Sequence, residues 1–406
     1  MGTKNYSSYS DLITFSRAST GTYLDSDGVL KSATTNTPRV EYDYQGNRLG
    51  LLVEEARTNV VLYSSDVAQS AWIKRGSASS QKIATDIFGN ANSASRVSIG
   101  QSGINDFYES AYNTVRFSVS VAVSPSFYIK TITTTGTLSV QNAINGSTVG
   151  RWLIDLSLLS TTTYEHITET HPAVTVDVPF VSTTSGHGGL LFCSNTIDII
   201  SFDIDGIQLE QGSFPTSYIP TSGATATRSA DVASIGVGAF GYNKGAGTVL
   251  MTLDSAQTAN FPGAVAFNGN SGADRWYLYS SSGTWAARQF IDNVGTGTIN
   301  LSAVEASAET KLALALKGSS ASAVKDGGSV VNNATFPIPP LIDEMEIGDG
   351  PGGVTQLNGH ISSIAYYPRR LTDAQIKALT SPPETPTLSL TFDDSSTSYL
   401  ETSIHG

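Results

Sequence analysis

Short stretches of alternating apolar and polar residues recur along most of the chain, separated by Gly, Pro, Asn and Ser. Between Arg116 and Val123, every second residue is apolar, so one side of an extended segment is hydrophobic. Residues 174–181, 197–209 and 361–367 have apolar residues at the spacing of strands. The pattern therefore predicts a protein built mainly from β-strands.

One short helix is predicted near the end of the chain. Thr372 and Gln375 stand at the two positions of a capping box. Leu371 and Ile376 occupy the positions at which a hydrophobic staple fixes the entry of the chain into a helix. We expect this helix to follow the last strand of a sandwich.

Composition supports this class and excludes others. The 406 residues are enough for two or three domains, and 39% are hydrophobic while only 14% are charged. That balance is typical of a turn-rich, all-β extracellular or virion protein. The net charge is −12 and no basic run occurs, so nucleic acid is not an expected partner.

The sequence also bears on location. The first residues have no apolar core for a signal peptide, and no segment approaches the roughly 20 apolar residues of a membrane helix. Cys193 is the single cysteine, so no intrachain disulfide is expected. An outward-facing β protein without disulfides indicates synthesis in the bacterial cytoplasm and later exposure, as for part of a virion.

Three blocks near the start resemble a recurrent module of tailed-phage and prophage structural proteins, which are tail, fibre or head-fibre components. They are RASTGTYLDSDGVL from Arg17, PRVEYD from Pro38 and GLLVEEARTN from Gly50, in the family's order. A fourth block, QLEQGSFPTSYIPT from Gln208, belongs to the same family. The resemblance implies a location in the virion, partnership with other virion proteins and a homotrimer or other homo-oligomer.

Adjacent acids in the third block invite a catalytic interpretation. Glu54 and Glu55 are neighbours on a predicted strand, so their side chains point to opposite faces and cannot share a substrate. We therefore expect structural ion pairs with Arg39 or Arg57.

The end of the chain resembles a concanavalin A-like lectin sandwich of the laminin-G or pentraxin type. The resemblance rests on MEIG from Met345, LNG from Leu357, the strand after it and the small helix. The expected fold is all-β, with a small N-terminal β module, a jelly-roll sandwich and a concanavalin A-like sandwich with one short closing helix. The expected limits are 1–59 for the N-terminal attachment module, 60–226 for the jelly-roll, 227–380 for the lectin-like domain, and 381–406 for a linker and a C-terminal strand.

The candidate binding residues lie in RWYLY, which begins at Arg275, and in the following strand. Alternation puts Trp276 and Leu278 on one face and Arg275, Tyr277 and Tyr279 on the other. The plainer interpretation is that all these aromatics serve the framework, since every β-sandwich of this size needs them. The alternative is a glycan site in which Tyr277, Tyr279 and Trp285 stack on sugar rings while Arg275 or Arg288 binds hydroxyls or an acidic sugar.

Two further features are candidates for chemistry. Asp203 and Asp205 share one strand face, where many jelly-rolls hold a structural Ca²⁺, with Asn59 or Asp66 as further oxygen ligands; the alternative is a solvated strand face. No cofactor is otherwise required. Glu344 and Glu346 have the same-face spacing of glycosidase carboxylates but lack the third acid of the usual pattern.

The sequence therefore predicts a virion structural protein of a tail or head fibre or decoration that contacts host-surface polysaccharide without catalysis. A purely architectural virion component is the first alternative, and a polysaccharide depolymerase is the second. Membrane insertion is not expected.

Overall fold

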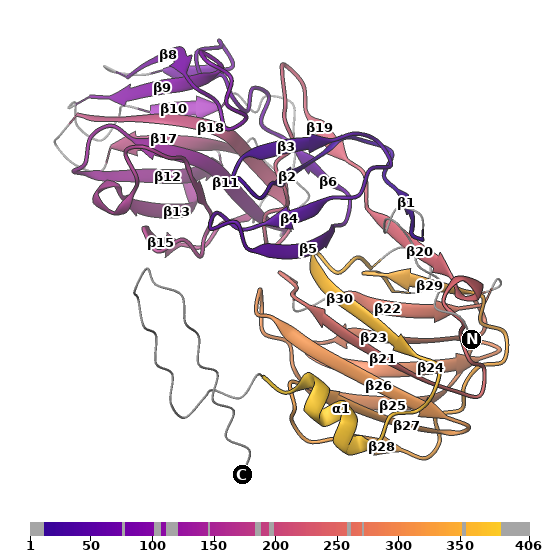
Figure 1. The fold of residues 1–406 in the computed structure, drawn as a ribbon. Helices are drawn as coiled ribbons and strands as arrows, with labels where there is room; N and C mark the ends of the chain where they lie inside the picture. Colours follow the sequence, from indigo (N-terminus) through magenta and orange to yellow (C-terminus); the bar gives the residue numbers. More distant parts are fainter. Residues whose placement is uncertain are drawn as a thin grey trace, which may run out of the picture.

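A computed structural model describes residues 12–74, 78–100, 107–110, 121–144, 147–182, 188–194, 199–257, 261–269, 272–350 and 355–382. The described chain is mainly β-strand and forms two lobes (Figure 1). It has one α-helix, α1 (Asp373–Thr380), and two short 3-10 helices, η2 (Leu156–Leu158) and η3 (Val237–Ala239). The predicted all-β class is confirmed. No helix in these residues has the length and apolar character needed to cross a membrane.

The first lobe is a sandwich of two antiparallel sheets that enclose one core. Phe127, Trp152, Phe192 and Phe202 are among its buried side chains. One sheet has the order β15 (Val174–Val178), β13 (Ser147–Asp155), β12 (Thr137–Ile144), β17 (Gly188–Ser194), β10 (Phe107–Ser110), β7 (Trp72–Lys74). The other has the order β14 (Glu165–Ile167), β11 (Val121–Thr131), β18 (Ile200–Gln211), β9 (Ala94–Ile99), β8 (Ser79–Ala84), and β16 (Val181–Ser182) pairs with β11. Of the strand predicted at 116–123, residues 116–120 lie outside the described ranges, and 121–123 begin β11.

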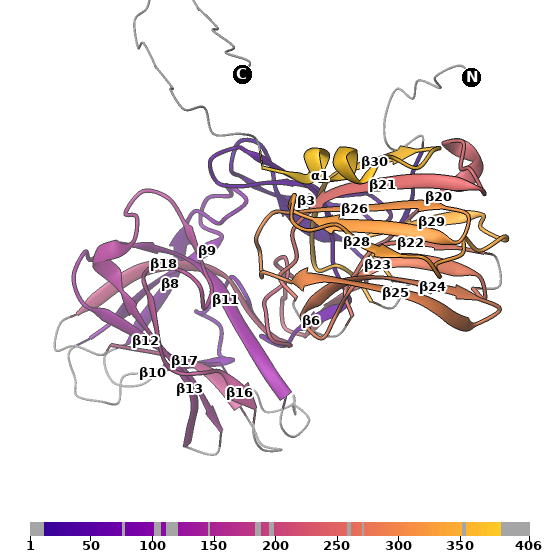
Figure 2. The same ribbon diagram turned by 90° about the horizontal axis from the view of Figure 1, so that it is seen from below.

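The second lobe is a sandwich of two seven-stranded sheets. The front sheet has the order β1 (Thr14–Ser16), β20 (Val232–Gly236), β29 (Glu344–Ile347), β22 (Gly263–Asn268), β23 (Arg275–Ser281), β24 (Thr284–Ile291), β25 (Val294–Ala303). The back sheet has the order β28 (Val331–Asn333), β27 (Ser320–Lys325), β26 (Thr310–Lys317), β21 (Ala246–Leu253), β30 (Gly359–Tyr367), β5 (Arg48–Val53), β4 (Val40–Tyr42). Helix α1 lies on the back sheet, on the side away from β23 and β24 (Figure 2).

The N-terminal strands belong to this second lobe. β1 pairs with β20, and β5 pairs with β30, so both sheets are extended by residues from the first 53 positions. Two local pairs lie there, β2 (Gly21–Leu24) with β3 (Leu30–Ala33) and β4 with β5, while β6 (Arg57–Asn59) pairs with β19 (Ala226–Arg228). Residues 1–59 are therefore not a separate β module in their described part. The other predicted limits stay predictions, and the strand expected at 388–392 lies outside the described residues.

The closing helix begins as the sequence predicts. The Thr372 hydroxyl accepts a hydrogen bond from the Gln375 backbone N–H, and the Gln375 side chain accepts one from the Thr372 backbone N–H. Leu371 and Ile376, at the staple positions, are both buried in a small cluster with side chains of β26 and β27. The cap satisfies N–H groups that the first turn leaves without an intrahelical partner.

The sequence blocks that resemble phage proteins meet in one buried ion-pair network between the lobes. Arg39 lies 2.8 Å from Glu54 and 2.5 Å from Asp231, and Arg17 lies 3.0 Å from Asp231. Arg228 lies 3.4 Å from Glu54. These side chains are at most 6% exposed, so three guanidinium groups and two carboxylates are paired away from water.

The fourth block is fixed to the same network. The Ser217 backbone N–H and hydroxyl both donate to the Glu54 carboxylate, at 2.7 and 2.6 Å. Burial opposes ionisation of Glu54, but Arg228, Arg39 and the Ser217 hydrogen bonds outweigh it and lower the pKa of Glu54 to about 2. Glu55 pairs instead with Arg57 at 2.5 Å, so the predicted structural ion pairs are confirmed.

Candidate functional site

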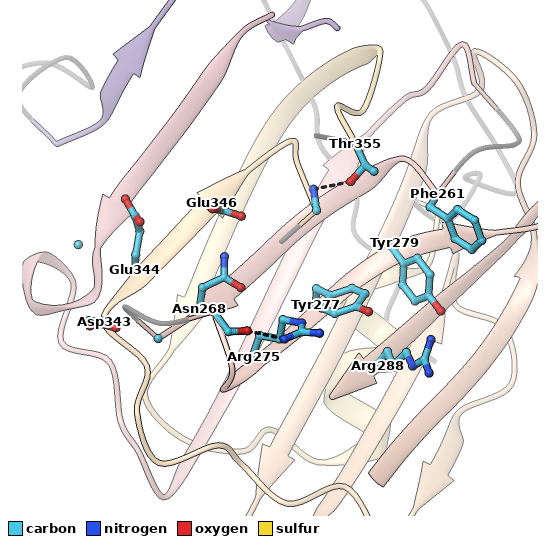
Figure 3. A pocket seen from close by; sticks show the side chains of 14 residues that line it. Phe261, Asn268, Arg275, Tyr277, Tyr279, Arg288, Asp343, Glu344, Glu346 and Thr355 are labelled. Carbon is cyan, nitrogen blue, oxygen red and sulfur yellow. Dashed lines mark hydrogen bonds between the residues drawn. The ribbon is translucent and has the colours of Figure 1, made fainter. Parts of the chain in front are cut away.

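The outer face of the front sheet carries most of the predicted binding residues. On β23, Trp276 and Leu278 point into the core, while Tyr277 and Tyr279 pack in a separate cluster on the outer face. The predicted alternation of this strand is therefore confirmed. Arg275, from β23, and Arg288, from β24, lie on the same outer face and line a hollow of about 830 Å³ together with the two tyrosines (Figure 3).

Strand pairing sets the arrangement of the hollow. In one row across the sheet, Glu346 is opposite Ala266, Ala266 is opposite Tyr277, and Tyr277 is opposite Arg288. Ala266 has no exposed surface and packs with Tyr277 and Tyr279 in the cluster on this face. Adjacent strands are about 4.8 Å apart, which places the Glu346 and Arg288 backbones roughly 14 Å apart.

A neighbouring row completes the polar lining. Glu344 is opposite Asn268, and Asn268 is opposite Arg275. The two glutamates thus lie on the β29 side of the hollow and the two arginines on the β23 and β24 side (Figure 3). The same-face spacing predicted for Glu344 and Glu346 is confirmed, because both line the hollow while Met345 between them is buried in the core.

The two arginines are gathered at one aromatic ring. The guanidinium carbons of Arg275 and Arg288 lie 4.1 and 4.7 Å from the centroid of Phe290, within the range of cation–π contacts. Arg275 also donates to the side chain of Asn293 at 2.9 Å. Arg288 is exposed and has no carboxylate or hydrogen-bond partner among the described residues, so its donors face solvent.

Trp285 does not belong to this face, which corrects the prediction that it stacks on a sugar. Its side chain is 1% exposed and lies in the core between the sheets. The reason is the turn between β23 and β24, in which only Ser282 and Gly283 are unpaired. That turn puts Trp285 opposite Ser280, and residue 280 is on the same face as Trp276 and Leu278.

Phe261 is a lining residue that the sequence analysis missed. The residue is 53% exposed, and its ring stacks on Tyr279 with a centroid distance of 6.2 Å and an interplanar angle of 17°. Its backbone φ is 59°, although the next residue is Pro262 and residues before proline favour extended backbone. Strained backbone of this kind clusters at binding sites. The exposed ring extends the aromatic surface beyond the two tyrosines, and no pattern of alternation marks it.

Asn268 is the second missed residue. It is 7% exposed, yet its Oδ1 atom has no hydrogen-bond partner among the described residues. A buried acceptor of this kind normally has a partner, because leaving it unsatisfied costs about 1–3 kcal/mol. Asn268 lies in the hollow beside Glu344 and Arg275, so a bound molecule can supply the missing donor (Figure 3).

The predicted calcium ligands have protein partners instead. Arg96 lies 2.8 Å and Lys130 3.1 Å from the Asp203 carboxylate, so two cations already neutralise it. Asp205 accepts backbone N–H groups of Ile87 and Gly206, and burial raises its pKa to about 6. A carboxylate shared by two cations and another already held by backbone N–H groups do not fit a Ca²⁺ ligand set.

The proposed completing ligands also have other roles. The Asn59 side-chain oxygen accepts the backbone N–H groups of Val61 and Leu209, at 3.0 and 3.2 Å. Asp66 accepts from Gln69 at 2.9 Å and pairs with Lys82. Among the residues that the structure describes, no group of three His, Cys, Asp or Glu side chains is placed to hold a metal ion.

Comparison with known proteins gives limited likenesses. No protein-family model matches the chain, and no curated protein matches it. Similar solved structures include the Ruminococcus gnavus IT-sialidase carbohydrate-binding module CBM40 bound to α2,3-sialyllactose (18% identity, 34% of this chain and 84% of that chain, TM-score 0.30). They also include a heptameric SAP-like pentraxin from Limulus polyphemus (13%, 34% and 70%, TM-score 0.29) and the NanB sialidase of Streptococcus pneumoniae (13%, 40% and 28%, TM-score 0.31).

Proposed function

We propose that this protein is a structural component of a tailed-phage virion, in a tail or head fibre or decoration, that contacts host-surface glycans without catalysis. The hollow on the outer face of the front sheet supports the glycan part of the proposal. The four sequence blocks that resemble phage structural proteins support the virion part, since they are present in the family's order.

The observation that carries glycan binding is the combination of aromatic and polar side chains in the hollow. Phe261 offers an exposed ring, which suits the apolar C–H face of a sugar, and Tyr277 and Tyr279 line the hollow beside it at 8% and 7% exposure. Arg275, Arg288 and Asn268 offer donors and acceptors for the hydroxyl rim. A volume of about 830 Å³ lies within the range of small-molecule sites, roughly 300–1,000 Å³.

The test is binding of the full chain to an array of host-surface polysaccharides. We expect saturable binding that Phe261→Ala weakens several-fold, because the ring is 53% exposed and its removal leaves the core intact. Leu379→Ala is the matched control: Leu379 is 51% exposed but lies on α1, on the opposite side of the sandwich. Absence of binding to every polysaccharide, or equal loss in the two variants, contradicts a glycan site in the hollow.

A depolymerase has one observation in its favour, the pair Glu344 and Glu346 in the same hollow as the aromatic rings. Glycosidases place two carboxyl groups roughly 5–10 Å apart, and residues two apart on one strand face satisfy this spacing. New reducing ends or unsaturated uronates released from host polysaccharide, and lost in Glu346→Gln, would establish the enzyme and overturn the binding proposal.

Assembly is tested separately from ligand binding. We propose a homotrimer or other homo-oligomer that partners other virion proteins. Light scattering of the purified chain should give a mass that is a multiple of 42.7 kDa. Electron microscopy of particles labelled through this chain should place it on the tail or head surface. A monomer that is absent from particles contradicts the virion role, whereas particles left incomplete by deletion, with no glycan bound, favour a purely architectural role.

A further inference from the structure

We infer that the hollow selects an acidic amino sugar, a residue with a carboxylate at one end and an amino or acetamido group at the other. This inference rests on the proposed glycan binding and adds the class of sugar. It is argued from the separation of charge across the hollow: cations on β23 and β24, and acceptors on β29 and β22.

The cationic end is uncompensated in an acidic chain. The chain has a net charge of −12, yet Arg275 and Arg288 converge on Phe290 without a carboxylate partner among the described residues. Two like charges at one ring repel each other, and an anion bound between or beside them relieves the repulsion. Planar guanidinium groups match the geometry of a carboxylate, so a uronic or other sugar acid is the anion that fits.

The opposite end calls for donors. Glu344 is exposed and has no ion-pair or hydrogen-bond partner among the described residues, and the Asn268 Oδ1 atom is buried without a donor. Glu346 and Asp343 line the same side, which makes this end negative. An ammonium or amide N–H can donate hydrogen bonds to these acceptors. A charged ammonium is also attracted to the carboxylates.

The distance between the two ends suits one sugar ring. Glu346 and Arg288 lie in one row across the sheet, and their side chains shorten the gap of roughly 14 Å between their backbones. The ring of the sugar can lie beside Tyr277, which lines the hollow, with its acid toward Arg288. Its nitrogen substituent then points toward Asn268 and Glu344.

The experiment measures the affinity of the full chain for four monosaccharide probes by saturation-transfer NMR. The probes are galactose, galacturonic acid, galactosamine and 2-acetamido-2-deoxygalacturonic acid. We expect the last to bind most tightly, and its advantage over galactose to shrink as NaCl rises from 20 to 500 mM because salt screens the charges. Equal affinity for all four probes overturns the inference and leaves glycan binding standing, whereas no binding by any probe or by host polysaccharide overturns both.

Two variants assign the ends. Arg288→Gln should remove roughly 10-fold to 100-fold of the preference for the acids over the neutral sugars, the range for a hydrogen bond to a charged group. Glu344→Gln should reduce the preference for the amino sugar and leave the preference for galacturonic acid unchanged. Arg369→Gln and Glu305→Gln, exposed residues outside the hollow, are the matched controls. If the controls change the preferences as much as the test variants, the assignment is wrong.

Discussion

The Arg39 guanidinium and the Asp231 carboxylate lie 2.5 Å apart, although 192 positions separate them in the sequence. Neither side chain has exposed surface. The pair joins the block that begins at Pro38 to the start of the second lobe, and Glu54 binds the same arginine from a third block. The most recognisable sequence motifs of the chain therefore hold its parts together.

The first prediction concerns this network. Arg39→Ala removes the buried guanidinium that Asp231 and Glu54 share, so the free energy of unfolding should fall by about 3–5 kcal/mol. Arg151→Ala is the control, because Arg151 and its partner Asp177 are 41% and 37% exposed and such pairs contribute about 0–1 kcal/mol. Urea denaturation followed by circular dichroism measures both. Similar losses of unfolding free energy in the two variants would show that the buried ion pairs stabilise the fold no more than the exposed pair does.

The second prediction separates core from surface in the β23–β24 hairpin. Trp285→Ala should lower the free energy of unfolding by about 3–5 kcal/mol, because it empties a fully buried site. Ligand affinity per folded molecule should stay the same. Arg288→Gln, at an exposed position of β24 on the outer face, should reduce affinity instead. Loss of ligand affinity in a stably folded Trp285→Ala protein would show that Trp285 takes part in binding.

The third prediction is a pH dependence from His360, which lies 2.8 Å from Glu41 and 3.0 Å from Asp254. Burial alone would lower the pKa of His360, but hydrogen bonds and charge from the two carboxylates raise it to about 10. The folded pKa is above the unfolded value of about 6.5. The stabilisation is therefore complete below pH 6.5 and is lost as the pH rises through about 10.

Thermal melting between pH 6 and 10.5 measures this effect. In His360→Gln the fall in melting temperature over that range should be smaller than in the unaltered chain. His166 has the opposite pH dependence. Burial, with a smaller contribution from His171, lowers the pKa of His166 to about 4. The protein therefore loses stability as the pH falls from about 6.5 to 4, because the buried imidazole resists protonation. A pH profile unaltered by His360→Gln contradicts the paired-histidine geometry.

The fourth prediction concerns calcium. Since Arg96 and Lys130 already bind the Asp203 carboxylate, neither EDTA nor millimolar CaCl₂ should shift the melting temperature. Asp203→Ala should destabilise the first lobe equally in both solutions, because it removes the 1% exposed carboxylate that both cations bind. A rise in melting temperature with CaCl₂ that Asp203→Ala abolishes would restore the metal site.

Local pattern was enough to predict some features and not others. The helix cap at Thr372 and the alternation from Arg275 to Tyr279 depend on residues within one turn or one strand, so their sequence specifies them. Trp285 was misplaced because its face depends on the pairing across the turn, which puts it opposite Ser280 on the core side of β23. Pairing the two strands across a turn made of Ser282 and Gly283 predicts the core position of Trp285 correctly.

Pairing between distant strands has no local signature. The sequence of residues 48–53 does not predict that β5 pairs with residues 359–361. The sequence of residues 14–16 does not predict that β1 pairs with residues 232–234. Such partners are chosen by the packing of the whole sandwich. Phe261 and Asn268 could not be predicted as site residues for a similar reason. The positive φ of Phe261 and the unsatisfied amide oxygen of Asn268 depend on the strands that surround them.

The position of β5 beside β30 has a consequence for the order of events on the ribosome. The described strands of the first lobe all come from residues 72 to 211, so that lobe can complete itself while translation continues. The opening 53 residues must instead wait until residue 367 has emerged before both sheets of the other lobe are whole. A fragment starting at residue 232, or a chain shortened at its front, is therefore left with open sheet edges. Binding measured with such a truncated chain would therefore reflect the loss of sheet structure as well as the ligand site.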